Sequence, residues 1–392
     1  TGRPAHRPQA GRASALRRDE RHLRRTRRVH AAREGVWAHV GDQRLLNFSG
    51  NDYLGFAQHP DVTAAFINGA RRFGVGSAGS ALVSGYFSAH QALERQAAEL
   101  FGYEACLYVG SGYLANIGVL QTLLDENAVC VQDKLNHACL LDGARFSGCR
   151  LKRFPHQDMD SAEKLCAQTG NRIGLLVSDG VFSMDGDAAK LPELAHIAEK
   201  ANITLMIDDA HGVGVLGDSG LGSLQAAQLG AAQVPLLVIP AGKALGGQGA
   251  LILSNTDIIN HLVETARPYL FSTAPAPAMA CALSQALHCL QQQPEHHARL
   301  QDNIRHFSAL AAQAGLPVLP SCSAIHALMA GSNESALHMA EQLRERGFWL
   351  SAIRPPTVPQ GKARLRITLT ALHEREHIER LVETLHAIGV RP

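Results

Sequence analysis

The sequence lacks several features that define other classes of protein. Its 392 residues include no apolar run of about 20 residues, the length that a membrane-spanning helix needs. Its eight cysteines form no Cys-x-x-Cys pair and have no regular spacing, which favours reduced, buried thiols in a cytoplasmic protein. The formal net charge is only +2, so we expect neither nucleic acid nor a membrane as a partner.

The composition is that of an ordinary globular enzyme. Hydrophobic residues make up 46% of the chain and charged residues 18%. A chain of this length is long enough for two domains that share buried surface.

The first part of the chain is unusually basic. Residues 1–33 hold eleven arginines against two acids. Such a segment is typical of a nucleic-acid arm, a transit peptide or a solvated helix. Because no apolar region or cleavage-type site follows, we expect a solvated helix after loosely ordered first residues. The chain begins at Thr1, and the natural start of the protein is left open.

Short apolar runs alternate with helical stretches over the middle of the chain. This alternation predicts an α/β fold with a mostly parallel sheet covered by helices on both faces. From about residue 280, helical segments alternate with short strands, which predicts a smaller α+β domain. We divide the chain into an arginine-rich segment (1–47), a large domain (48–277) and a small C-terminal domain (278–392). The apolar runs are residues 105–109, 128–132, 173–177, 203–207, 235–239 and 249–253.

Three motifs suggest other functions, but their surroundings argue against each. Residues 373–377 match His-Glu-x-x-His, the helix signature of zinc proteases. They open an amphipathic helix whose apolar face packs, so we expect both histidines to face water and no metal to bind. Residues 74–79 and 212–217 match Gly-x-Gly-x-x-Gly, but the first follows a helix and the second precedes a loop. Both are predicted to be glycine turns near a site.

Polar side chains follow several of the apolar runs, where parallel sheets bind their ligands. Lys243 comes soon after the run 235–239 in an apolar setting. Burial there favours the neutral amine, which can form an imine with an aldehyde. Asp208 directly follows the run 203–207 and can pair with a protonated ring nitrogen, and His211 is three residues further on.

The turn at residues 110–113 completes this constellation. It opens a helix, so its backbone N–H groups can hold a phosphate. An amine, a buried carboxylate and a phosphate-binding turn together predict a site for pyridoxal 5′-phosphate (PLP).

Three longer strings make the prediction more specific. Residues 49–55 (Ser-Gly-Asn-Asp-Tyr-Leu-Gly), 180–187 (Gly-Val-Phe-Ser-Met-Asp-Gly-Asp) and 208–212 (Asp-Asp-Ala-His-Gly) resemble signatures of the α-oxoamine synthases. The resemblance extends from about Leu23 to the C-terminus. It implies a fold-type-I PLP enzyme with the aspartate-aminotransferase-like architecture, an acyltransferase that works as a homodimer.

The resemblance also implies roles for individual residues. Lys243 matches the lysine that forms the imine with PLP, and His137 matches the histidine that stacks on the ring and assists proton transfer. Asp208 matches the partner of the ring nitrogen, and His211 matches that of the phenolic oxygen. The remaining matches are Gly112, Tyr113 and Ser183 as cofactor contacts, Ser272 and Thr273 as phosphate contacts from the neighbouring subunit, Asn51 and Arg354 for the amino acid, and Arg24 and Thr357 for the acyl substrate. Arg25 is the alternative to Arg24, because a one-residue insertion before Trp37 blurs the correspondence.

Two segments of the small domain point to one branch of the family. Residues 352–359 and 363–366 are most similar to members that condense L-alanine with a pimeloyl thioester in biotin biosynthesis, with loss of carbon dioxide. The acyl carrier is either coenzyme A or an acyl-carrier protein. The alternatives are a glycine C-acetyltransferase, a 5-aminolevulinate synthase or a serine palmitoyltransferase. A PLP-binding homologue with impaired turnover and the zinc hydrolase are further alternatives from other classes.

The chain departs from the family pattern at three places. Pro240 stands three residues before Lys243, where the family usually has Thr or Ser with a hydroxyl for the phosphate. The segment before Ser84 has Ala78, Ala81 and Leu82 where Gly, Gly and His are usual, and residues 247–249 form an unusual loop. Loss of one charge-assisted hydrogen bond costs about 1.5–3 kcal/mol, so Pro240 is expected to weaken cofactor binding without abolishing it.

Overall fold

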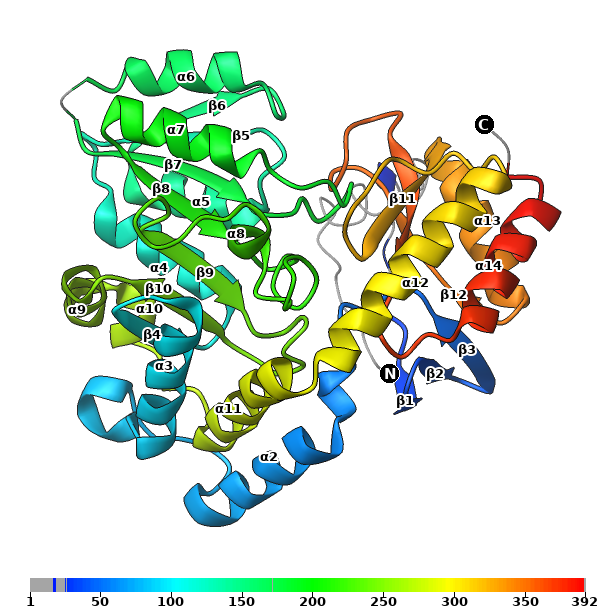
Figure 1. The fold of residues 1–392 in the computed structure, drawn as a ribbon, viewed down its shortest axis with the longest axis horizontal. Helices are drawn as coiled ribbons and strands as arrows, with labels where there is room; N and C mark the ends of the chain where they lie inside the picture. Colours follow the sequence, from blue (N-terminus) through cyan, green and yellow to red (C-terminus); the bar gives the residue numbers. More distant parts are fainter. Residues whose placement is uncertain (1–16, 19–24, 26, 171, 391–392) are drawn as a thin grey trace, which may run out of the picture.

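The computed structural model describes residues 17–18, 25, 27–170 and 172–390, which fold into two domains (Figure 1). The large domain is built around a seven-stranded sheet, and the small domain lies beside it. Within the described ranges, no helix has both the length and the apolar character needed to cross a bilayer. The predicted α/β class with a mostly parallel sheet is confirmed.

The sheet of the large domain has the strand order β4-β10-β9-β8-β7-β5-β6. Five consecutive strands, from β9 to β6, run parallel, whereas β10 is antiparallel to both β4 and β9. All but β6 match predicted apolar runs to within two residues. The strands are β4 (Ala105–Val109), β5 (Val129–Asp133), β6 (Arg150–Phe154), β7 (Gly174–Asp179), β8 (Thr204–Asp208), β9 (Leu236–Pro240) and β10 (Ala250–Ser254).

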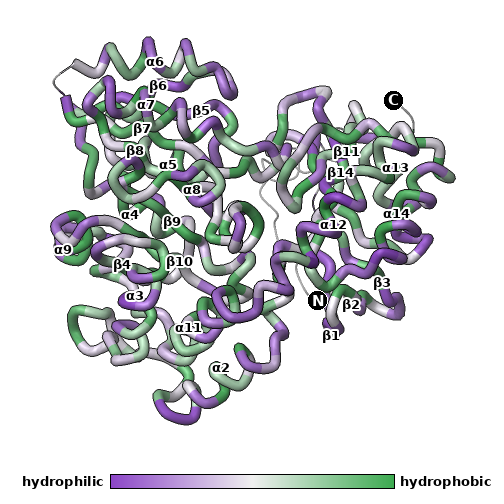
Figure 2. The backbone as a smooth tube through the Cα atoms, viewed as in Figure 1, coloured by the Kyte–Doolittle hydropathy of each residue, from purple (hydrophilic) through white to green (hydrophobic). Residues whose placement is uncertain are grey.

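Alternate residues of the central strands face two separate cores. In β8, Leu205 and Ile207 pack in one core and Met206 packs in the other. Figure 2 shows these strands as hydrophobic tubes inside a more hydrophilic outer layer of helices. One core is covered by α3 (Ser88–Phe101), α6 (Met159–Ala167), α7 (Leu191–Ala201) and α11 (Pro277–Gln292), and the other by α4 (Gly112–Leu123), α5 (Ala138–Ser147) and α9 (Thr256–Thr265).

The small domain combines two sheets with three helices. A three-stranded sheet has the order β11-β14-β13, and a second has the order β1-β2-β3-β12. The strands are β1 (His30–Glu34), β2 (Trp37–Val40), β3 (Gln43–Asn47), β11 (Ile325–Gly331), β12 (Phe348–Trp349), β13 (Ser351–Ile353) and β14 (Ala363–Thr368). The helices are α12 (Pro294–Gln313), α13 (Asn333–Glu345) and α14 (Arg375–Ala387).

The basic N-terminal segment differs from its prediction. Residues 17–18 are helical, but residues 30–34 form strand β1, which pairs with β2 instead of extending a solvated helix. The physical reason is strand pairing: β1 pairs with β2, β2 pairs with β3, and β3 places Leu45 and Leu46 in the core. The other residues of the predicted helix and the loosely ordered first residues lie almost entirely outside the described ranges.

Helices α2 and α11 join the two domains along one side of the molecule (Figure 1). Helix α11 packs tightly on α2, because a Cβ on Gly69 would lie 2.8 Å from the Cα of Ala278. Helix α12 then continues the chain into the small domain. The remaining elements are η1 (Phe56–Gln58), α2 (Pro60–Phe73), η2 (Ala81–Gly85), α8 (Ser223–Ala226) and α10 (Arg267–Leu270).

Candidate active site

A cavity of about 340 Å³ lies at the C-terminal ends of the parallel strands. This is where the sequence placed the ligand site, because the polar residues follow the apolar runs. All seven residues predicted to contact the cofactor from within one chain line this cavity: Gly112, Tyr113, His137, Ser183, Asp208, His211 and Lys243.

Lys243 lies in the turn that connects β9 to β10. Backbone hydrogen bonds fix this turn, since the N–H of Ala241 donates to the Gly249 carbonyl at 2.9 Å and that of Gly246 donates to the Lys243 carbonyl at 2.9 Å. Burial lowers the pKa of Lys243 from its usual 10.5; the Asp208 carboxylate opposes this change and the Arg366 guanidinium adds to it. A larger fraction of the amine is therefore neutral, the form that attacks an aldehyde.

Asp208 is the last residue of β8 and is 4% exposed. Its Oδ2 accepts a hydrogen bond from Asn116 Nδ2 at 2.6 Å, and its Oδ1 accepts one from the N–H of Ala210 at 3.0 Å. Burial raises the pKa of Asp208, although the Asn116 hydrogen bond and the charges of His137 and Lys243 oppose it. A protonated ring nitrogen in the cavity would offset the cost of burying this carboxylate. The contribution of Asn116, on α4, was missed from the sequence.

His211 belongs to a buried network that includes a missed arginine. The Tyr53 hydroxyl lies 2.5 Å from His211 Nδ1 and 3.3 Å from Asn51 Oδ1. Arg366 donates to the same Asn51 oxygen at 3.1 Å and to the Ser183 carbonyl at 2.7 Å. Burial lowers the pKa of His211 well below 6.5, and the positive charge of Arg366 acts in the same direction, so the imidazole is neutral. Arg366 therefore links Asn51 to Ser183, which lines the cavity.

His137 is positioned by hydrogen bonds between its loop, which follows β5, and the end of the neighbouring strand β7. Its N–H donates to Asp179 Oδ2 at 2.9 Å, and the Asn136 side chain donates to the Val177 carbonyl at 2.8 Å. Burial and the nearby Asp208 charge raise the pKa of Asp179 well above its usual value. Asp179 was not predicted as a site residue. The signal was present, because it follows a buried run as Asp208 does.

The N-terminus of α4 lines the cavity and is the part that would hold the cofactor phosphate. Ser111 caps the helix by accepting from the Leu114 N–H at 3.2 Å, and the first N–H groups of a helix have no partner within it. Pro240 packs directly on Gly112, because a Cβ there would lie 2.7 Å from the proline Cγ. The proline ring therefore stands beside the phosphate side and offers no donor.

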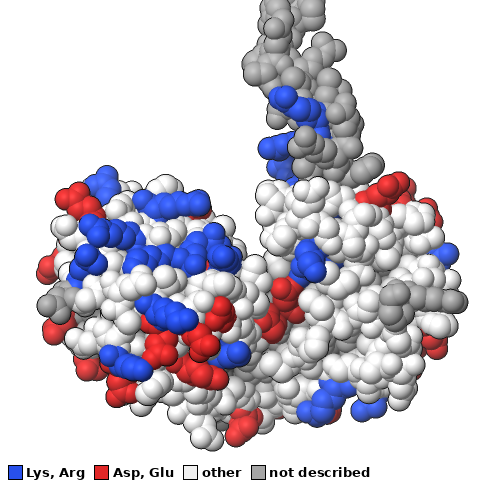
Figure 3. Space-filling model, turned by 90° about the horizontal axis from the view of Figure 1, so that it is seen from above, with Lys and Arg blue, Asp and Glu red and all other residues white. Residues whose placement is uncertain are grey.

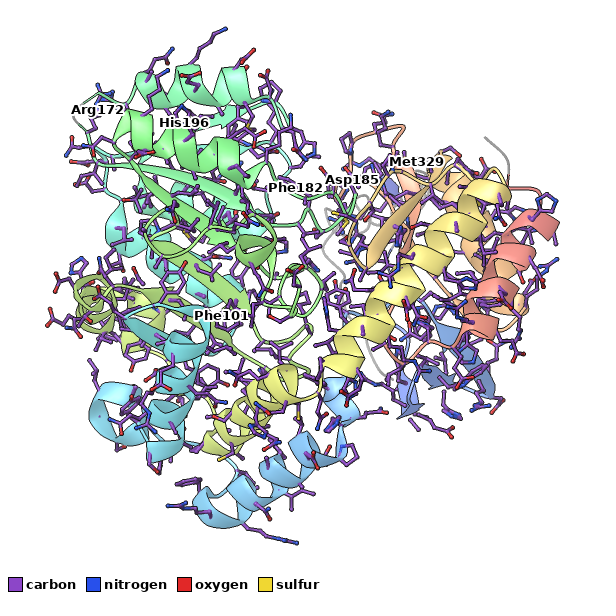
Figure 4. All side chains as sticks on the ribbon, viewed as in Figure 1. Phe101, Arg172, Phe182, Asp185, His196 and Met329 are labelled. Atoms are coloured by element: carbon purple, nitrogen blue, oxygen red, sulfur yellow. The ribbon has the colours of Figure 1, made fainter. Side chains whose placement is uncertain are left out.

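A second, larger cavity of about 710 Å³ adjoins the first, and His137 and Ser183 line both. It lies between the domains, where Phe182 and Asp185 of the large domain approach Met329 of the small domain (Figure 4). Thr357 is among its lining residues, as predicted for the acyl substrate. Figure 3 shows Lys and Arg side chains gathered on the large domain beside the hollow between the domains.

Of the other predicted substrate residues, Asn51 and Arg354 line neither cavity, although Asn51 accepts a hydrogen bond from Arg366. Arg24 lies outside the described residues, whereas Arg25 donates to Thr357 Oγ1 at 3.0 Å. Arg354 directly follows β13, and its pKa is lowered by burial and, to a lesser extent, by the charge of Arg25. Ser272 and Thr273 do not line the cofactor cavity of their own chain. Thr273 is exposed and Ser272 is half-buried.

The two histidines of the zinc-type motif are used in the fold. His373 is 0% exposed, contrary to the expectation that it faces water. Its Nδ1 accepts from the Thr370 N–H at 3.0 Å, its Nε2 lies 3.2 Å from the Asn47 carbonyl, and its ring stacks on Phe48. His377 Nδ1 accepts from the Glu374 N–H at 3.1 Å, which agrees with the interpretation of the motif as a helix start.

One group of metal-type side chains was not anticipated from the sequence. In the described part of the chain, His59, Asp61 and Cys289 bring ligand atoms within 4.8 Å of one another. His59 caps α2 by accepting from the Asp61 N–H at 3.3 Å, so the group lies at the positive end of that helix. A cation is disfavoured there.

The residues of the first cavity fit PLP. The cavity presents a half-buried amine that would hold the aldehyde, a buried carboxylate that would pair with the ring nitrogen, and a neutral imidazole that could donate to the phenolic oxygen. The N-terminus of α4 supplies N–H groups for the phosphate.

Comparisons with known proteins agree with this chemistry. Residues 43–385 match the model of the aminotransferase class I and II family. An 8-amino-7-oxononanoate synthase from Stenotrophomonas maltophilia is 47% identical over 369 residues, which cover 94% of this chain and 90% of that protein.

Solved structures also resemble the chain. A serine palmitoyltransferase variant from S. paucimobilis, with bound PLP and myriocin, is 26% identical with a TM-score of 0.92, covering 97% of each chain. An 8-amino-7-oxononanoate synthase from Francisella tularensis is 27% identical with a TM-score of 0.77, covering 88% of this chain and 97% of that one.

Proposed function

The chain belongs to the aminotransferase class I and II family and to its 8-amino-7-oxononanoate synthases, and from this membership we propose how its cavities carry out the reaction. It is a PLP-dependent acyltransferase of biotin biosynthesis. It condenses L-alanine with a pimeloyl thioester to give 8-amino-7-oxononanoate, carbon dioxide and the free thiol. The observation that carries the residue assignments is the cavity that holds Lys243, Asp208 and His211 and adjoins a second cavity at His137.

The chain's own groups bind the cofactor and move protons. Lys243 would hold the cofactor aldehyde through its amine and, once L-alanine has displaced that amine, would be the base placed to take the α-proton. Asp208 keeps the ring nitrogen protonated, and PLP supplies an electron sink when bound. His211 would donate to the phenolic oxygen of the cofactor. His137 would lie against the cofactor ring and could donate a hydrogen bond to the thioester oxygen as negative charge develops there.

The second cavity holds the acyl substrate. Its volume of about 710 Å³ and its largely apolar lining suit a seven-carbon chain joined to a pantetheine thiol. Thr357 and Arg25 contact the acyl substrate, while Asn51 and Arg354 hold the carboxylate of L-alanine. Arg25 is the better candidate of the two neighbouring arginines because of its hydrogen bond to Thr357. The carrier is coenzyme A or an acyl-carrier protein.

A second copy of the chain completes each active site. Ser272 and Thr273 reach the phosphate of the neighbouring subunit in this proposal. Their loop is tied to residues 77–79, because the Ala274 N–H donates to the Gly79 carbonyl at 2.9 Å and Ser77 Oγ donates to the Pro275 carbonyl at 2.6 Å. These segments carry Val83, 83% exposed, and Phe271, 72% exposed, apolar surface that a partner would cover.

We place the enzyme in the cytoplasm. All eight cysteines are free, which is usual where thiols stay reduced.

The spectrum of the purified protein with PLP tests the proposal. We expect an imine band at about 420 nm that changes on addition of L-alanine. Addition of pimeloyl-CoA should then release free thiol. Glycine and serine in place of L-alanine are the controls for the related synthases. An imine band without thiol release from either coenzyme A or carrier-protein thioesters would leave a PLP-binding protein with impaired turnover. Absence of the band would contradict the cofactor assignment.

A further inference from the structure

His156 lies at the junction of two loops that line the active site, and we propose that it is a positioning residue for both. As an imidazolium, it joins the loop that carries His137 to the loop that carries Ser183. The inference rests on the proposed function, because the geometry that it maintains is that of the PLP site.

Two carboxylates contact the His156 ring, one at each nitrogen. His156 Nδ1 lies 3.0 Å from Asp133 Oδ1, and its Nε2 lies 2.8 Å from Asp187 Oδ2. A neutral imidazole has one N–H and can donate to only one of them, whereas an imidazolium donates to both. Two ionised carboxylates are therefore both satisfied only by the protonated ring. Its charge also offsets the cost of burying Asp133, which is 1% exposed.

Asp133 sets the conformation of the first loop. It ends β5, and its Oδ1 accepts from the N–H of Leu135 at 2.7 Å. The chain then passes through Asn136 to His137, whose N–H is bound by Asp179. A shift of Asp133 would therefore move the ring of His137 in the cofactor cavity.

Asp187 does the same for the second loop, residues 182–187. The Phe182 N–H donates to the Asp187 carbonyl at 2.9 Å, and the Gly186 N–H donates to the Phe182 carbonyl at 2.8 Å. This closed turn contains Ser183. The Phe182 ring also meets the His156 ring edge-on, with centroids 4.4 Å apart. His156 therefore contacts this loop by charge and by packing.

The neighbouring Gln157 also binds both carboxylates, which is independent support for a link at this junction. Its φ of 56° lies in the left-handed region, which is unfavourable for a residue with a side chain. In that conformation its N–H donates to Asp133 Oδ2 at 2.9 Å and its side chain donates to Asp187 Oδ2 at 2.6 Å. The unfavourable backbone conformation of Gln157 is offset by these two hydrogen bonds to Asp133 and Asp187.

The charged surroundings of His156 give the pH range of the link. Burial lowers the pKa of His156, but the hydrogen bonds and charges of Asp133 and Asp187 outweigh it and raise the pKa to about 9. Other titratable groups lie near this junction: Lys190 donates to the Gln157 carbonyl, the charge of Asp187 acts on the Cys322 thiol, and the charge of Asp133 acts on Asp179. Because the folded pKa is raised, the link is complete at neutral pH and is lost as the pH rises through about 9.

His156→Gln is the first test, with His196→Gln as the matched control. His196 is exposed on α7, away from both cavities (Figure 4). Hydrogen exchange of the cofactor-free protein should show faster exchange in residues 134–138 and 182–187 together, by about tenfold at neutral pH. The dissociation constant for PLP should rise by about tenfold in the same variant. The control should change neither quantity.

Several outcomes would overturn the proposal. One is a His156→Gln protein that unfolds at a lower temperature while both loops and PLP affinity stay unchanged. Another is faster exchange in only one of the two loops. If the unaltered protein does not bind PLP, the proposed function fails, and the exchange experiment still decides the role of His156.

Asp187→Asn provides a second test should the first variant fold poorly. Removal of one carboxylate should lower the pKa of His156 and should increase hydrogen exchange in residues 182–187. NMR of the imidazole protons measures the pKa. An unchanged pKa of His156 in this variant would contradict the link.

Discussion

Pro240 is the residue whose replacement should change cofactor binding in a predictable direction. Pro240→Thr supplies a hydroxyl beside Gly112 on the phosphate side of the cavity. One charge-assisted hydrogen bond is worth about 1.5–3 kcal/mol, so we expect the dissociation constant of PLP to fall by about tenfold or more. Titration of cofactor-free protein with PLP measures it. Pro240→Val has the shape of threonine without the hydroxyl, and an equal gain there would refute the explanation.

Lys243 should react with the cofactor at lower pH than an ordinary lysine. Its pKa is lowered from 10.5, chiefly by burial, so its neutral form is populated at a pH where exposed lysines remain charged. The rate of imine formation should rise with pH and then level off, and the midpoint of this rise should lie below pH 10.5. Stopped-flow absorbance after mixing with PLP measures this midpoint. Lys243→Ala should show no imine band, and a band that persists there would assign the imine to another amine.

At the residue scale, the sequence could predict groups that belong to continuous strings. Lys243, Asp208 and His211 follow buried runs, and the structure brings all three to one cavity. Asn116 and Arg366 could not be found this way, because their importance comes from contacts across long sequence separations. The roles assigned to individual residues stay predictions until variants are tested.

At the scale of elements, the turn at residues 182–187 forms a buried ion pair that should contribute strongly to the free energy of unfolding. Arg364 of β14 pairs with Asp185, and their side chains are 5% and 19% exposed. Asp185→Asn leaves a buried guanidinium without its counter-charge, which costs about 3–5 kcal/mol. The free energy of unfolding in urea measures the loss.

The exposed pair of Arg305 and Asp302 is the control for this prediction. Its side chains are 68% and 56% exposed, so Asp302→Asn should cost about 1 kcal/mol or less. Similar losses in the two variants would mean that burial of Arg364 contributes little.

Elements differed in how far the sequence revealed them. Buried strands were predicted closely, because continuous apolar runs leave few other interpretations. The antiparallel direction of β10 could not be predicted, since its sequence fits either direction. Strand β6 was missed because it lies at the sheet edge and carries Arg150, Lys152 and Arg153. Strand β1 was missed because its side chains are all exposed and only pairing with β2 makes it a strand.

At the scale of the whole molecule, the division into domains follows composition only approximately. The boundaries after residues 47 and 277 remain a proposal. Strand β3, before the first boundary, pairs with β12, and α11, after the second, packs on α2. Both contacts join residues that are far apart in the sequence, and neither can be predicted from local composition or periodicity.

The proposed homodimer gives the last prediction. Val83→Glu and Phe271→Glu place a charge on exposed apolar surface beside the Ser272 loop, and burying an unpaired charge is costly. We expect each variant to be monomeric in sedimentation while the unaltered chain is dimeric, and to bind PLP more weakly because the partner's phosphate contacts are gone. Ile173→Glu is the control, since Ile173 is equally apolar and 64% exposed but precedes β7 at the opposite end of the sheet. A monomeric variant with undiminished PLP affinity would show that each chain completes its own cofactor site, and a monomeric unaltered chain would contradict the dimer itself.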